Sequence, residues 1–211
     1  MRAQRIRPGT PNAKHFSELV ARVQEVGRPK AIYAVSYIEE RSEDSVVVGG
    51  VRFVSRALRR NLDSVERIFP YIATCGTEAD AIAIPPDDLV QAMWLWTLKE
   101  AVLRAAREHL FKHLSATYRL SHYATMDPGS GDAEVWPIEQ QKELFSLFGD
   151  VEGLIGVKLT DAMLMIPTMS VSGIVFPTET EFESCQICHR ADCPRRKAPF
   201  NEEVWQAMCA E

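Results

Sequence analysis

The sequence lacks the features that mark a membrane, secreted or nucleic-acid-binding protein. No apolar run reaches the roughly 18 residues of a membrane span, because Lys158, Asp161 and Pro167 interrupt the longest candidate. The basic N-terminus has no apolar core of the kind found in secretory signals. A formal net charge of −5 disfavours a nucleic-acid partner. We therefore expect a cytoplasmic protein without a membrane or nucleic-acid partner.

The sequence also has no glycine-rich nucleotide-binding motif of the G-x-G-x-x-G or G-x-x-x-x-G-K-[ST] type, no internal repeat and no low-complexity segment. Its 211 residues are 46% hydrophobic, which is enough for a substantial core. We expect a single domain over residues 1–211, in which residues 178–211 form a cysteine-rich C-terminal extension. In a reducing compartment its five cysteines do not predict a disulfide framework.

Periodicity and capping residues predict the local elements. Asn12, Ser55 and Asp87 or Asp88 are candidate helix caps. The predicted helices span residues 13–26, 56–62, 88–118, 138–148 and 201–209, with a loop at 121–136. The predicted strands span residues 31–38, 45–54, 65–74, 155–159, 163–166 and 174–176. The first two form a predicted hairpin, with a bulge or bend at Gly49-Gly50. Because strands cluster instead of alternating with helices, we expect an α+β fold with a largely antiparallel twisted sheet and flanking helices.

The least random stretch is LIGVKLTDAMLMIPTMSVSGIVF, residues 154–176. Here two short apolar segments are separated by Thr160-Asp161. A break at Pro167 and a run of small residues, Ser170-Val-Ser-Gly173, follow. Upstream, Pro128-Gly129 forms a turn-like dipeptide before the helix at 138–148.

The order and spacing of these residues resemble the C-terminal activation domain of cobalamin-dependent methionine synthase, in a stand-alone form with a C-terminal Cys cluster. That family carries a Pro-Gly loop, a helix and then a Gly-x-x-Leu-Thr…Met-x-Pro-x-x-Ser-Val-Ser-Gly pattern. The matching positions are Pro128-Gly129, Gly156, Leu159-Thr160, Met165, Pro167 and Ser170–Gly173. The segment from Phe69 to Glu78 is also similar to the stretch before the long helix in stand-alone members.

The resemblance implies an accessory domain that binds S-adenosylmethionine (AdoMet) and docks on a cobalamin or corrinoid protein. It implies reductive remethylation of cob(II)alamin, in support of a methionine synthase lacking its own activation domain or of a related corrinoid methyltransferase. A flavodoxin-like or other donor would supply the electron. No residue is needed as a catalytic acid or base, because the domain contributes positioning. The implied AdoMet-binding residues are Glu100, Thr125, Pro128, Gly129, Ser130, Ser170, Ser172 and Gly173.

The loop departs from the family pattern at two positions. The family has an Arg three residues before the proline and a Tyr after the glycine, where this chain has Thr125 and Ser130. An Arg suits the AdoMet carboxylate because its planar guanidinium binds a carboxylate in bidentate fashion. Arg119 and His122 are nearby candidates for that role. An alternative function is a metal- or iron–sulfur-binding accessory protein that keeps the fold but has lost AdoMet binding.

The cysteines near the C-terminus form the second informative motif, Cys185-x-x-Cys188-x-x-x-x-Cys193-Pro. Thiolates at this spacing suit a structural zinc site or an iron–sulfur cluster, each of which takes four ligands. Cys75, Cys209 or a small molecule could supply the fourth ligand, as could His189, which we interpret rather as a bystander. A redox role for the thiols, and reduced cysteines without a ligand, are the other interpretations.

Overall fold

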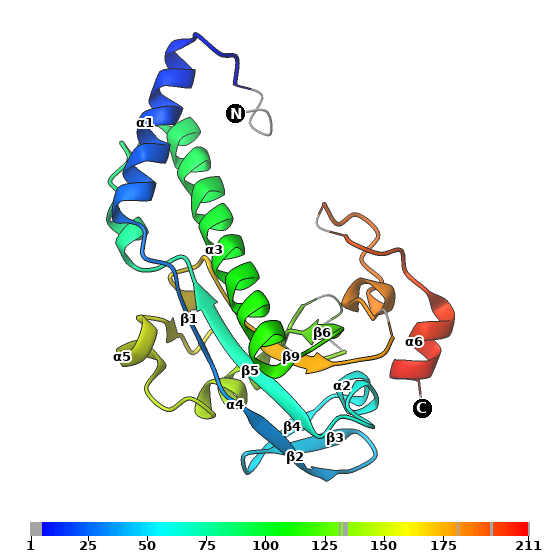
Figure 1. The fold of residues 1–211 in the computed structure, drawn as a ribbon. Helices are drawn as coiled ribbons and strands as arrows, with labels where there is room; N and C mark the ends of the chain where they lie inside the picture. Colours follow the sequence, from blue (N-terminus) through cyan, green and yellow to red (C-terminus); the bar gives the residue numbers. More distant parts are fainter. Residues whose placement is uncertain (1–5, 131, 133–134, 181, 195, 211) are drawn as a thin grey trace.

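The computed structural model describes residues 6–130, 132, 135–180, 182–194 and 196–210 (Figure 1). Its helices are α1 (Pro11–Val26), α2 (Arg56–Asn61), α3 (Leu89–Tyr118), α4 (Gln141–Ser146), α5 (Val151–Ile155) and α6 (Glu202–Cys209). Short 3-10 helices are η2 (Glu78–Ala81), η3 (Ile138–Gln140) and η4 (Ser184–Ile187). The strands are β1 (Lys30–Tyr33), β2 (Ser36–Arg41), β3 (Ser45–Val48), β4 (Val51–Val54), β5 (Arg67–Thr74), β6 (Tyr123–Met126), β7 (Lys158–Leu159), β8 (Met165–Ile166) and β9 (Ser170–Pro177).

An antiparallel sheet organises the molecule, in the order β4-β3-β2-β5-β9-β6, with β1 also paired to β5. The predicted strand at 31–38 is divided into β1 and β2 at the position of Pro70 in β5. Ala34 donates its N–H to the carbonyl of Pro70 at 3.0 Å, but the proline has no N–H to return. The hydrogen-bond ladder between the two strands is therefore interrupted at this position. The sheet as a whole confirms the antiparallel α+β class predicted from the sequence.

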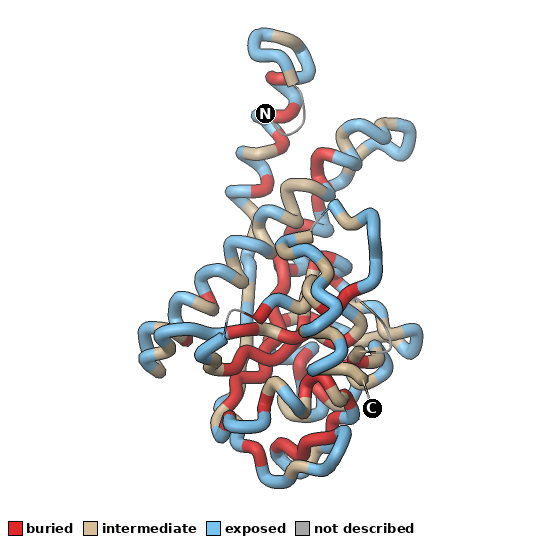
Figure 2. The backbone as a smooth tube through the Cα atoms, turned by 90° about the vertical axis from the view of Figure 1, so that its right-hand side faces the viewer, coloured by how far each residue is buried: buried red, intermediate tan, exposed pale blue. Residues whose placement is uncertain are grey.

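The sheet buries apolar side chains on both faces. One face packs against α2, α4 and α5, with core residues that include Phe53, Ile72 and Phe176. The other face packs against the C-terminal half of α3, through Tyr71 and Val175 among others. Figure 2 shows most of the buried residues gathered in the lower, wider part of the molecule.

Helix α1 and the N-terminal half of α3 form an arm that extends away from the sheet (Figure 1). A separate apolar cluster joins the two helices, centred on Phe16, Leu19 and Trp94. Asp88 caps α3 by accepting a hydrogen bond from the N–H of Gln91 at 2.8 Å. Among the described residues, no helix is long and apolar enough to cross a membrane.

Several local predictions need correction. Thr10, not Asn12, caps α1. Gly49 and Gly50 form a two-residue turn between β3 and β4, because both adopt the positive φ (58° and 73°) that such hairpins require. The predicted 121–136 loop contains strand β6.

The region from 138 to 159 also differs from its prediction. The helix at 138–148 is η3 followed by the short α4, and residues 151–155, assigned partly to a strand, form α5. Asp150 caps α5 by accepting from the N–H of Gly153 at 2.8 Å, after Gly149 has turned the chain at φ 70°. A local cap thus outweighs the strand preference of the apolar residues that follow.

Candidate functional site

The Pro-Gly loop begins directly after β6, the last strand in the sheet order. Gly129 has φ 70°, and a Cβ atom at this position would lie 2.7 Å from the side chain of Ile138. Its N–H donates to the carbonyl of Trp136 at 2.8 Å, and the N–H of Ser130 donates to the carbonyl of Asp127 at 3.1 Å. Positive φ and close packing together require glycine, so the loop has a defined shape.

Asp127, immediately before Pro128, lies at the centre of a polar cluster. Its carboxylate accepts a 2.8 Å hydrogen bond from the hydroxyl of Tyr71 in β5. The guanidinium of Arg107 in α3 lies 3.5 Å from the other carboxylate oxygen and donates to Oγ1 of Thr125 at 3.3 Å. Side chains from a helix, two strands and the Pro-Gly loop therefore meet at one point.

Gly173 completes this cluster from β9. It pairs with Tyr71 in the sheet register. A Cβ atom on Gly173 would lie 1.9 Å from Oδ1 of Asp127 and 2.7 Å from the carbonyl oxygen of Met126. The final residue of the Ser170-Val-Ser-Gly173 segment is thus glycine because the Asp127 carboxylate lies against the strand at this position.

Burial dominates the electrostatics of the cluster. It raises the pKa of the Asp127 carboxyl, while the charges of Arg107 and Lys197 and the Tyr71 hydrogen bond oppose that rise. The pKa of the Tyr71 phenol is raised well above its ordinary value, chiefly by burial and then by the Asp127 charge. Tyr71 therefore stays protonated and donates its hydrogen bond.

Arg107 packs against two aromatic rings, which also contact each other edge to face. Its guanidinium carbon lies 5.1 Å from the centre of the Phe111 ring and 5.9 Å from that of Tyr71. The Nε atom is buried and has no hydrogen-bond partner in the part of the chain that the structure describes. The side chain as a whole is 28% exposed, so an anionic group would reach the guanidinium at atoms other than the buried Nε.

The other sequence-predicted site residues are distributed around this cluster. Ser170 donates its hydroxyl to the carbonyl of Pro167 at 2.7 Å, and the hydroxyl oxygens of Ser170 and Thr74 lie 2.9 Å apart. Ser172 points to the opposite face of the sheet, where the Gln141 amide donates to its hydroxyl at 3.0 Å. Glu100 lies in α3 seven residues before Arg107, about 10 Å along the helix on the same side.

Sequence reasoning missed Arg107, Asp127 and Tyr71. The two cations named as substitutes for the family Arg are not part of this cluster. Arg119 is the left-handed residue that ends α3, and His122 is exposed just before the start of β6. The only local signal was the position of Asp127 next to Pro128.

The cysteines among the described residues do not form one metal-binding group. Cys75 is completely buried at the end of β5, beside Met169, whereas Cys185 and Cys188 lie in and just after η4 and Cys209 ends α6. Among the residues that the structure describes, no group of three or more His, Cys, Asp or Glu side chains is arranged to hold a metal ion. The zinc or iron–sulfur site at Cys185, Cys188 and Cys193 stays a prediction.

Comparison with known proteins finds a family match that spans this loop and strand. Residues 97–190 match the activation domain family, described as "Vitamin B12 dependent methionine synthase, activation domain". This stretch contains Arg107, the Pro-Gly loop and Gly173, and the resemblance predicted from the sequence is confirmed. No curated protein sequence matches the chain.

A solved structure with a similar fold is the crystal structure of the MetH reactivation domain bound to AdoHcy (S-adenosylhomocysteine). The TM-score is 0.58 at 16% sequence identity, with 98% of this chain and 80% of that chain covered. At this identity the likeness concerns the fold.

Proposed function

We propose that this domain binds AdoMet beside the Asp127–Gly129 loop and presents the methyl group to cobalamin held by a partner protein. The observation that carries the proposal is the convergence of Arg107, Asp127 and Gly173 on the Pro-Gly loop. The family match over residues 97–190 and a fold shared with an AdoHcy-bound domain support it.

Arg107 would bind the carboxylate of AdoMet. In the family pattern an Arg at the position of Thr125 is suited to this task. Here the guanidinium of Arg107 comes from α3 and lies 3.3 Å from Oγ1 of Thr125, so the same charge reaches the same place from a different element. The Arg107 side chain is 28% exposed, so its guanidinium can also meet a ligand carboxylate, at atoms other than the buried Nε.

Asp127 would face the cationic part of the ligand. The amino-acid end of AdoMet is a zwitterion, and its sulfonium carries a further positive charge. Arg107 and Asp127, 3.5 Å apart, present one positive and one negative group side by side. Such a pair complements a zwitterion better than it complements a ligand with a single charge. The Tyr71 hydroxyl, which donates to Asp127, fixes the carboxylate for this contact.

The chemistry requires positioning and no general acid or base. One electron from an external donor converts cob(II)alamin to cob(I)alamin. The cobalt electron pair of cob(I)alamin then attacks the sulfonium methyl, forming a cobalt–carbon bond. The sulfur–carbon bond breaks with its electrons left on sulfur, giving methylcobalamin and AdoHcy. The partner would be a corrinoid protein or a methionine synthase without its own activation domain.

Calorimetric titration with AdoMet, AdoHcy and methylthioadenosine tests the proposal. Methylthioadenosine keeps the adenosine and thioether but lacks the amino-acid part that Arg107 and Asp127 would hold. We expect saturable, mutually competitive binding of AdoMet and AdoHcy, and affinity for methylthioadenosine lower by about tenfold or more. No binding of AdoMet or AdoHcy at millimolar concentration to folded protein would refute the proposed function.

A further inference from the structure

The C-terminal chain crosses the outside of the Pro-Gly loop. We call residues 183–194 the tail segment, which includes η4 and lies beside β6 in Figure 1. Ser184 donates its hydroxyl to the carbonyl of Thr125 in β6 at 3.1 Å. Nδ1 of His189 lies 3.0 Å from a carboxylate oxygen of Asp132, just beyond the loop. The segment is thus fastened on both sides of Pro128-Gly129.

The tail segment also closes a cavity next to Asp127 with room for about one water molecule, which adjoins the proposed ligand site and does not contain it. Asp127, Ser130 and Asp132 line the cavity from the loop side, and Ser184 and Ile187 line it from the tail side. Ile187 is buried against the core of the sheet. The tail segment therefore forms the wall of this cavity opposite the loop.

Arg196 holds the tail segment in its curved shape. Its guanidinium donates to the carbonyls of Cys185 at 3.0 Å, Cys188 at 3.2 Å and Arg190. The following N–H, that of Lys197, lies 3.4 Å from the sulfur of Cys185. One guanidinium thus binds three carbonyl groups along the segment. A lysine cannot make the same set of hydrogen bonds, because its charge is compact and its donors have a different geometry.

We infer that the tail segment is the outer wall of the ligand site and that Arg196 is a positioning residue for the Pro128-Gly129 loop. The part that concerns the ligand rests on the proposed function. A plainer role would be to cover the exposed edge of β6, which would stabilise the sheet without shaping the loop. The two roles differ in what loosening the tail segment does to the loop.

The test compares Arg196→Lys with Arg60→Lys in the full chain. Arg60 is a matched control because its guanidinium also gathers backbone carbonyls, those of Gln206, Ala207 and Ala210 at the end of α6. Amide hydrogen exchange is measured over residues 125–130, and AdoHcy affinity is measured by calorimetry.

We expect faster exchange in the loop and about tenfold weaker AdoHcy binding for Arg196→Lys, with less than about a twofold change for Arg60→Lys. Unchanged loop exchange in Arg196→Lys, or an equal effect in both variants, would overturn the positioning role. Faster loop exchange with unchanged AdoHcy affinity would overturn the ligand wall. If the wild-type protein does not bind AdoHcy, the proposed function fails, and the exchange comparison alone decides whether Arg196 positions the loop.

Discussion

Replacing Arg107 with methionine is the most direct perturbation of the candidate site. Methionine keeps the length and apolar stem of the side chain but removes its charge and donors. The variant loses the 3.5 Å pair with Asp127, the 3.3 Å bond to Thr125 and the stacking on Phe111. It also leaves the buried Asp127 carboxyl with the Tyr71 hydroxyl as its remaining donor from this cluster.

Two magnitudes follow from these contacts. The arginine side chain is 28% exposed, so the stability loss should be modest, about 1–3 kcal/mol. A bound carboxylate would lose its charge-assisted hydrogen bonds, worth about 2–3 kcal/mol, which is about 30- to 150-fold in Kd. Chemical denaturation gives the first value, and calorimetric titration with AdoHcy gives the second.

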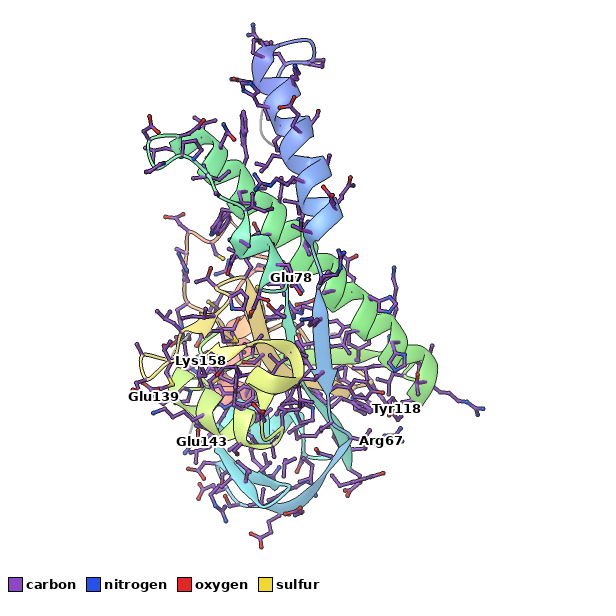
Figure 3. The ribbon with its side chains drawn as sticks, turned by 90° about the vertical axis from the view of Figure 1, so that its left-hand side faces the viewer. Arg67, Glu78, Tyr118, Glu139, Glu143 and Lys158 are labelled. Atoms are coloured by element: carbon purple, nitrogen blue, oxygen red, sulfur yellow. The ribbon has the colours of Figure 1, made fainter. Side chains whose placement is uncertain are left out.

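Arg67→Met is the matched control. Arg67 also stacks on two rings, 5.6 Å from the centre of Phe69 and 5.2 Å from that of Tyr118, and its Nε is likewise buried without a partner in the described chain. It lies near Tyr118 at the C-terminal end of α3 (Figure 3). Arg67→Met should lose similar stability and keep AdoHcy affinity. If the two variants bind AdoHcy equally well, Arg107 is a packing residue and the assignment of the carboxylate to it is wrong.

Three further predictions concern glycine, a buried thiol and the predicted metal. Gly173→Ala should destabilise the protein by about 1–3 kcal/mol in chemical denaturation, because its Cβ atom displaces Asp127; wild-type stability would contradict the close approach. Burial raises the pKa of the Cys75 thiol to about 11. The free energy of unfolding is therefore unaffected by this thiol below about pH 9 and falls by about 2–3 kcal/mol as the pH rises to 11, because the unfolded chain releases the proton more readily. Cys75→Ala should remove this pH dependence, which denaturant titrations at several pH values measure. If the cysteine tail binds a metal, Cys188→Ser should abolish the metal content measured by elemental analysis, and unchanged stoichiometric metal would contradict it.

The parts of the site that follow from the sequence are those encoded locally. Two of these parts could be recognised because their order and spacing along the chain match the family pattern, namely Pro128-Gly129 and the Ser170–Gly173 segment. The α3 helix was predictable from its periodicity and its Asp88 cap, and it ends at Tyr118 as expected. Each of these inferences needs only residues that are close in sequence.

The parts that the sequence did not reveal depend on contacts between distant segments. Arg107 looks like a solvated charge on a long helix, and only the packing of α3 on the sheet brings it to Asp127, 20 residues later. Tyr71 lies in a continuous apolar run that indicates a buried strand, with no sign that its hydroxyl meets a carboxylate. Likewise, the division of β1 from β2 requires knowing that Pro70 is the partner of Ala34.

The origin of the guanidinium also bears on how strongly the site binds. An arginine at position 125 would extend from β6 at the edge of the sheet, and its guanidinium would have to be ordered by the ligand and by its neighbours there. Arg107 is instead fixed in advance by a thirty-residue helix, by the rings of Tyr71 and Phe111 and by Asp127. Under the proposed function, less side-chain entropy is lost when the ligand binds, but its carboxylate must compete with Asp127 for the same cation. We therefore expect Asp127→Asn to weaken binding of the zwitterionic AdoHcy less than Arg107→Met does, because the asparagine frees the guanidinium for the ligand carboxylate. Calorimetry on the two variants measures this order, and the reverse order would mean that Asp127, and not Arg107, makes the dominant contact.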